Sequence, residues 1–70
     1  MTTTIEILVN GEPRAVPHGV SLLELLQDLH LDPRSVVVEH NRHIVRRPVL
    51  ADIHVSAGDM VELVHFVGGG

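Results

Sequence analysis

The sequence predicts a small α+β domain in which one amphipathic helix covers one face of a mixed sheet of four to five strands. Three observations support this fold class: a hairpin signal near the start of the chain, one capped leucine-rich segment after it, and several β-branched segments in the second half. A single amphipathic helix has to bury its apolar stripe against another element, and the sheet is the element that this order provides.

The first two strands are predicted from an alternating segment and a tight turn. Along residues 5–9 the apolar side chains of Ile5, Ile7 and Val9 fall on one face, which is typical of a strand with one buried side. Asn10-Gly11 is a favoured pair for a two-residue hairpin because both positions require positive φ. Residues 12–16 should therefore return as an antiparallel strand, and Pro13 suits an edge strand.

One helix of about ten residues follows, an ordinary length for a globular protein. Ser21 can cap its first turn and Glu24 completes a capping box. Four leucines at helical spacing form the stripe that should face the core. They are Leu22, Leu25, Leu26 and Leu29. Pro33 should end the helix by Leu31 or Asp32.

The second half of the chain is predicted to form strands joined by turns. Residues 36–40 are apolar and β-branched, as in an inner strand, and a turn near Asn41-Arg42 leads to a short return through residues 44–45. Residues 48–52 are predicted to be a connecting turn.

A turn at residues 57–59 should start the last strand, which the apolar run 60–67 indicates. The sequence thus predicts a β-grasp domain over residues 1–67. Residues 68–70 are expected to be a flexible glycine tail, because glycine accepts almost any backbone conformation.

Composition narrows the possible functions. Seventy residues suffice for one domain, and Phe66 is its only aromatic residue. Without cysteine there is no disulfide framework, thiolate nucleophile or cysteine-based zinc site. The net charge is −4 and the five basic residues are all arginine, so the chain favours a basic partner surface over nucleic acid. Without a signal sequence or an apolar run long enough to span a bilayer, we expect a cytoplasmic protein with no membrane contact.

Most polar residues are interpreted as structural. The arginines Arg42, Arg46 and Arg47 are read as a solvated group. We expect no metal site at the histidines, because they lack carboxylates or cysteines at metal-ligand spacing. They are His18, His30, His40, His43, His54 and His65. No nucleotide loop, catalytic triad or acid-base pair is visible, so the chain should have no enzymatic activity by itself.

The last strand carries the candidate binding residues. Alternation directs Val61 and Leu63 toward the helix and places four residues on the opposite face. These four are Met60, Glu62, Val64 and Phe66. An exposed apolar pair of Val64 and Phe66 beside the chain end predicts a docking surface, unless a loop covers it or strand twist returns Phe66 to the core. Asp59 is expected to shape the preceding turn, and Glu62 to contact basic residues of a partner.

Taken together, these features resemble the ThiS family, the bacterial sulfur carriers of thiamine biosynthesis with a ubiquitin-like β-grasp fold. The resemblance rests on the Asn10-Gly11 hairpin, the capped leucine helix, residues 36–41, Ala57-Gly58-Asp59, and the ending Val64 to Gly70. It implies that the first and last strands are central and parallel.

The resemblance also implies a chemistry for Gly68, Gly69 and Gly70. An adenylyltransferase similar to ubiquitin-activating enzymes would use ATP to adenylate the Gly70 carboxylate, and a sulfur donor such as a cysteine desulfurase would convert it to a thiocarboxylate. The chain would bind no cofactor itself and would deliver the sulfur to thiazole synthase. Three other functions stay open: a molybdopterin synthase small subunit with the same tail chemistry, a ubiquitin-like modifier conjugated to lysine, and a plain binding module.

Overall fold

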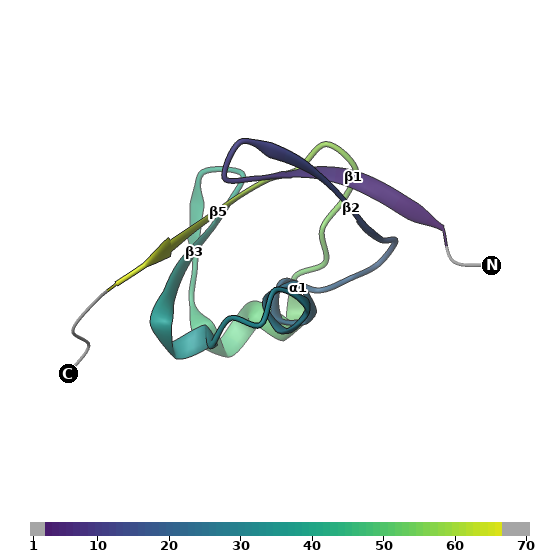
Figure 1. Cartoon of the computed structure of the whole chain (residues 1–70). Coiled ribbons are helices and arrows are strands. Elements are labelled where there is room, and N and C mark those ends of the chain that lie inside the picture. Colours follow the sequence, from purple (N-terminus) through teal and green to yellow (C-terminus); the bar gives the residue numbers. More distant parts are fainter. Residues whose placement is uncertain (1–2, 67–70) are drawn as a thin grey trace.

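The computed structural model describes residues 3–66, where one helix lies across a five-stranded sheet (Figure 1). The strands are β1 (Thr4–Val9), β2 (Glu12–Pro17), β3 (Val36–His40), β4 (His43–Val45) and β5 (Met60–His65), and the helix is α1 (Leu22–Asp28). Two short 3₁₀ helices, η1 (Pro33–Ser35) and η2 (Arg47–Asp52), flank β3 and β4. The prediction of an α+β β-grasp domain with a mixed sheet is confirmed.

The sheet order is β2-β1-β5-β3-β4, so the first and last strands lie side by side within the sheet. They are parallel, with Leu8 opposite Met60 and Val9 opposite Val61, whereas the other neighbouring strands are antiparallel. The central, parallel placement of β1 and β5 that the resemblance implies is therefore correct. Among residues 3–66, no helix is both long and apolar enough to cross a membrane.

The hairpin between β1 and β2 forms as predicted. Asn10 has φ 51° and Gly11 has φ 82°, the pair of left-handed conformations that a two-residue turn of this type needs. Pro13 lies in β2, which is an edge strand, where a missing N–H can face away from the sheet.

The start of α1 follows the predicted capping box. The Ser21 hydroxyl accepts a hydrogen bond from the Glu24 N–H at 3.1 Å, and the Glu24 carboxylate accepts one from the Ser21 N–H at 2.9 Å. These bonds satisfy amide groups that have no partner within the helix. Hydrogen bonds to the Glu24 carboxyl from the Ser21 N–H and from the Ser21 side chain hold the pKa of Glu24 below its usual value.

The end of α1 corrects the sequence prediction, because the helix stops at Asp28 and does not reach Leu31 or Asp32. His30 has φ 59°, and the N–H groups of His30 and Leu31 donate to the carbonyls of Gln27 at 3.1 Å and Leu26 at 2.9 Å. This pattern is a Schellman motif, which closes a helix by one left-handed residue. Glycine usually occupies that position, so a histidine there did not indicate the end of the helix in the sequence.

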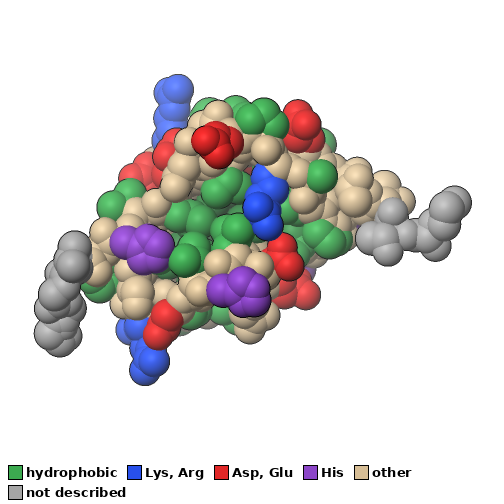
Figure 2. All heavy atoms as spheres, in the orientation of Figure 1, with side chains coloured by type: hydrophobic (Ala, Val, Ile, Leu, Met, Phe, Trp, Pro, Cys, Tyr) green, Lys and Arg blue, Asp and Glu red, His purple; other side chains and the backbone are tan. Residues whose placement is uncertain are grey.

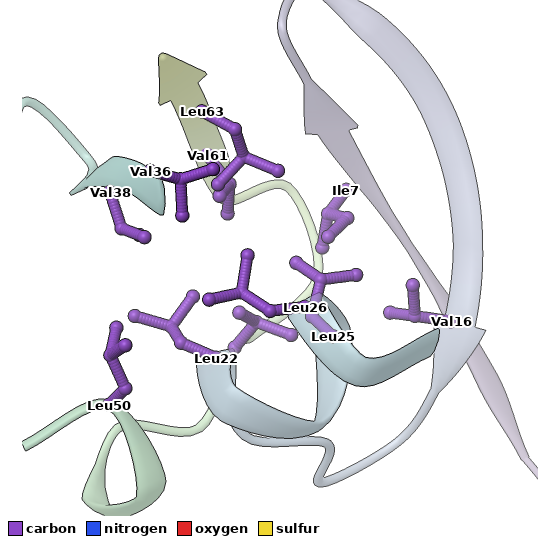
Figure 3. Packing of buried hydrophobic residues seen from close by; sticks show 11 residues of the cluster. Ile7, Val16, Leu22, Leu25, Leu26, Val36, Val38, Leu50, Val61 and Leu63 are labelled. Carbon is purple, nitrogen blue, oxygen red and sulfur yellow. The ribbon is translucent and has the colours of Figure 1, made fainter. Parts of the chain in front are cut away.

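The core lies between α1 and the inner face of the sheet (Figure 3). Its buried apolar residues come from the sheet, from α1, from η2 and from the segment before β5. They are Ile7, Val16, Leu22, Leu25, Leu26, Val36, Val38, Leu50, Val55, Val61 and Leu63. The leucine stripe thus faces the sheet as predicted. The prediction of a plain connecting turn at residues 48–52 was wrong, because η2 forms there and places Leu50 in the core with 1% exposure.

Candidate functional site

The structure places the predicted binding residues of β5 on the sheet face that points away from α1. Val61 is fully buried and Leu63 is 8% exposed, whereas Val64 is 54% and Phe66 48% exposed. The predicted alternation of inward and outward side chains is therefore correct. Phe66 follows the last residue of β5, and its N–H still donates to the Ser35 carbonyl at 3.2 Å.

Residues from three strands share this face, which we call the open face: Val37 and Glu39 of β3, Ile44 of β4, Met60, Glu62 and Val64 of β5, and Phe66 after it. Five large apolar side chains are exposed among residues 3–66, and Val37, Ile44, Val64 and Phe66 are four of them. Val37 stands directly opposite Val64 across the two strands. Exposed apolar residues gathered on one surface are a mark of a binding site.

Val37 and Ile44 contribute to this face although the sequence did not predict it. Residues 36–38 are three consecutive valines, so the sequence carries no signal for which of them points outward. The outward direction of Val37 follows from the buried Val36 and Val38, and that of Ile44 from its place opposite Glu39. That β3 and then β4 follow β5 in the sheet could not be predicted from the sequence, and only this order brings these side chains beside Val64.

The carboxyl end of β5 lies at the opposite end of the molecule from the start of β1 (Figure 1). The three predicted tail residues, Gly68, Gly69 and Gly70, lie outside the described residues, as does Val67 at the predicted domain boundary.

Two asparagine side chains fix β5 in place. The Asn10 side chain accepts from the Leu63 N–H at 2.7 Å and donates to the Leu63 carbonyl at 3.2 Å, as a neighbouring strand would. The Asn41 side chain accepts from the Met60 N–H at 2.9 Å. Both asparagines occupy left-handed turn positions, so the sequence indicated their turn role but not their second role.

A polar cluster joins the β3–β4 turn to the start of β5. The Nε2 atom of His40 lies 2.7 Å from a carboxylate oxygen of Asp59, and the same carboxylate accepts from the Ser56 N–H at 2.8 Å and from Asn41 at 3.2 Å. The prediction that Asp59 shapes its turn is confirmed. Burial raises the pKa of Asp59, but the hydrogen bonds from His40, Ser56 and Asn41 together outweigh it, so the pKa lies below its usual 3.8.

Asp59→Asn should therefore change the acid stability of the domain. A lowered pKa in the folded state means that the unfolded chain binds more protons near pH 3.8, so the stabilisation by Asp59 is present above that pH and is lost as the pH falls through the folded-state pKa. We expect the variant to lose about 1–3 kcal/mol at neutral pH and to show a shallower loss of stability in acid. Urea unfolding across a pH series measures the free energy of unfolding at neutral pH and its decline in acid. Asp52→Asn is the control, because Asp52 is exposed. An unchanged acid slope in Asp59→Asn would contradict this role.

Charges elsewhere are dispersed. In the view of Figure 2, acidic, basic and histidine side chains are interspersed with apolar ones. Arg42, Arg46 and Arg47 are all exposed, as a solvated group requires. Within the part of the chain that the structure describes, no pocket opens, and no three potential metal ligands come together.

Comparisons with known proteins agree over most of the chain. The model of the ThiS family matches residues 7–70. A thiazole synthase of Magnetococcus marinus is 38% identical over 66 residues, which cover 94% of this chain but only 20% of that enzyme, so the chain spans about a fifth of its length. The sulfur carrier protein ThiS of Bacillus subtilis is 34% identical over 50 residues, covering 71% of this chain and 76% of that protein.

A solved structure matches as well. The crystal structure of the thiamine biosynthesis protein (ThiS) from Geobacter metallireducens is similar with a TM-score of 0.82 and 33% sequence identity, and the match covers 94% of this chain and 100% of that one.

Proposed function

The chain belongs to the ThiS family, and on this premise we propose that it is a sulfur carrier protein of thiamine biosynthesis that holds sulfur on the carboxylate of Gly70. The observation that carries the proposal is the family match, which extends through the terminal glycines. The similarity to a sulfur carrier protein and to a thiazole synthase supports it, and favours the thiamine pathway over the molybdopterin alternative.

The proposed chemistry needs a partner, because a carboxylate is a poor acceptor until it carries a leaving group. An activating enzyme joins the Gly70 carboxylate to the adenylyl group of ATP and releases pyrophosphate. The outer sulfur of the donor's persulfide then displaces AMP, so that a carbon–sulfur bond replaces the carbon–oxygen bond to the phosphate. A thiol reductant supplies the two electrons that cleave the remaining sulfur–sulfur bond, which releases the donor and leaves the thiocarboxylate. The resulting thiocarboxylate is a soft nucleophile, and no cysteine of the chain competes with it.

In this proposal the chain is a protein cosubstrate, and thiazole synthase accepts its sulfur. Phe66, Val64, Met60 and Glu62 dock the domain on the activating enzyme, while Gly68 and Gly69 lead Gly70 into the active site. The exposure of Val64 and Phe66 supports this division of roles. Four residues beyond Phe66 reach at most about 13 Å, at about 3.3 Å per residue, so the docking surface and the active site have to lie close together.

Intact-mass spectrometry tests the proposal. The native chain is incubated with the adenylating enzyme of the same organism, ATP, a cysteine desulfurase with cysteine, and a thiol reductant. The mass should rise by the difference between sulfur and oxygen, and fragmentation should locate the change at Gly70. A mass that stays unchanged, under conditions in which a control sulfur carrier is converted, would overturn the sulfur-carrier role.

A further inference from the structure

The register of β3 and β5 sets two carboxylates against each other on the open face. Glu39 is directly opposite Glu62, so the two side chains project from neighbouring strands on the same side of the sheet. Cβ atoms of directly opposed residues are about 4.5–5.5 Å apart, and like charges in such positions destabilise a sheet. No salt bridge relieves this repulsion among residues 3–66, where those that form join Arg14 to Asp28, Arg34 to Asp32 and His40 to Asp59.

Apolar side chains flank this acidic pair. Ile44 stands opposite Glu39 on its other side, and the Val37–Val64 pair follows one step along the same two strands. On the far side Met60 comes two residues before Glu62, and Leu8 of β1 is opposite Met60. Side chains two residues apart along a strand share a face, so these apolar residues lie beside the two carboxylates. By the same rule the exposed Arg46 follows Ile44, but it forms no salt bridge with either glutamate among residues 3–66.

A partner that covers the open face has to match both its apolar side chains and its pair of carboxylates. Apolar contact over Ile44, Val64 and Phe66 would remove water from the carboxylates, which is costly unless a cation replaces it. A guanidinium suits two adjacent carboxylates better than an ammonium group, because its five N–H donors form a planar fork that can bind both of them.

We propose that the open face binds an apolar protein surface carrying an arginine, whose guanidinium inserts between Glu39 and Glu62. The identity of that partner as the activating enzyme rests on the proposed function. A second copy of this chain is a poor occupant, because a two-fold dimer would bring the same face against itself and gather four carboxylates.

The proposal predicts opposite effects on folding and on binding. Glu39→Gln and Glu62→Gln each remove the repulsion and should raise the melting temperature. Each should also raise the KM for the carrier in ATP–pyrophosphate exchange by the activating enzyme, by about tenfold or more, because a buried charged partner is lost. In the double variant the KM should rise by less than the product of the two single increases, since one cation contacts both carboxylates.

Glu6→Gln is the matched control. Glu6 lies on the same side of the sheet, is exposed, and is opposite Ala15, so this variant changes the net charge equally without a facing carboxylate. A general loss of electrostatic steering would affect all three single variants alike. If the two glutamine variants of the acidic pair match Glu6→Gln in KM, or melt at a lower temperature than the native chain, the arginine contact is wrong.

The same assay separates the two proposals. If the native chain supports ATP–pyrophosphate exchange and the variants support it equally well, only the arginine contact is contradicted. If the native chain supports no exchange, the carrier function is contradicted and, with it, the activating enzyme as the partner. Sedimentation of the native chain provides the remaining check, because a dimer that dissociates in Phe66→Glu would assign the open face to a second copy and overturn the proposal.

Discussion

Leu63→Glu is expected to unfold the domain, whereas Phe66→Glu should leave it folded. Leu63 faces the core and is 8% exposed, so a glutamate there would bury an unpaired charge. A single core of this size rarely supplies more than about 3–5 kcal/mol, which such a burial would exceed. Circular dichroism and thermal melting compare the two variants with the native chain.

Phe66→Glu should instead impair activation. The side chain is 48% exposed on the open face, so the substitution removes apolar contact and adds a charge where a partner docks. We expect adenylation to fall by at least about tenfold, the equivalent of about 1.4 kcal/mol. Val49→Glu is the matched control, because Val49 is a 42% exposed apolar residue of η2, away from the open face. A folded Leu63→Glu together with a fully active Phe66→Glu would show that docking occurs elsewhere.

Deletion of Gly70, or addition of a residue after it, should abolish sulfur loading. In the proposed function the reacting carboxylate has to be at a defined distance from the docking surface, and a shift of one residue moves it by about 3.3 Å. Reaction geometry is sensitive to displacements well below that distance. Intact mass after incubation with the activating enzyme, ATP and the sulfur donor measures the loss.

The same variants should keep the stability of the native chain. The buried core of the described residues extends from Ile7 to Leu63, so a change at residue 70 removes none of it. An added residue at the amino end is the control for chain length and should leave loading intact. Sulfur loading of the Gly70 deletion at the native rate would exclude Gly70 as the reacting residue.

The sequence by itself determined the features that depend on neighbours a few residues apart. The left-handed turn at Asn10-Gly11, the capping box of Ser21 with Glu24, and the alternation that buries Leu63 and exposes Val64 are such features. Each depends on backbone geometry or on a hydrogen bond within a single element, so residue type and spacing specify it.

Other local features differ from what the sequence predicts, because a residue occupies a position that its type rarely occupies. His30 ends α1 in a position that glycine usually fills, and the 3₁₀ helix η2 turns a predicted connection into a core element through Leu50. At η2 the burial of Leu50 in the core outweighs a weak local preference, whereas the exposed His30 lies in a turn that hydrogen bonds to the carbonyls of α1 close.

Only the tertiary structure decided which residues from different strands meet. Sheet order and register set Val37 beside Val64, Glu39 against Glu62, and the Asn10 side chain against the backbone of Leu63, although Asn10 and Leu63 are 53 residues apart in the chain. Such contacts arise when the helix and all five strands bury one common apolar face, and no segment encodes its neighbours by itself. The reacting group proposed at Gly70 comes from the family resemblance of the sequence, while the surface proposed to present it to a partner is a product of the assembled sheet.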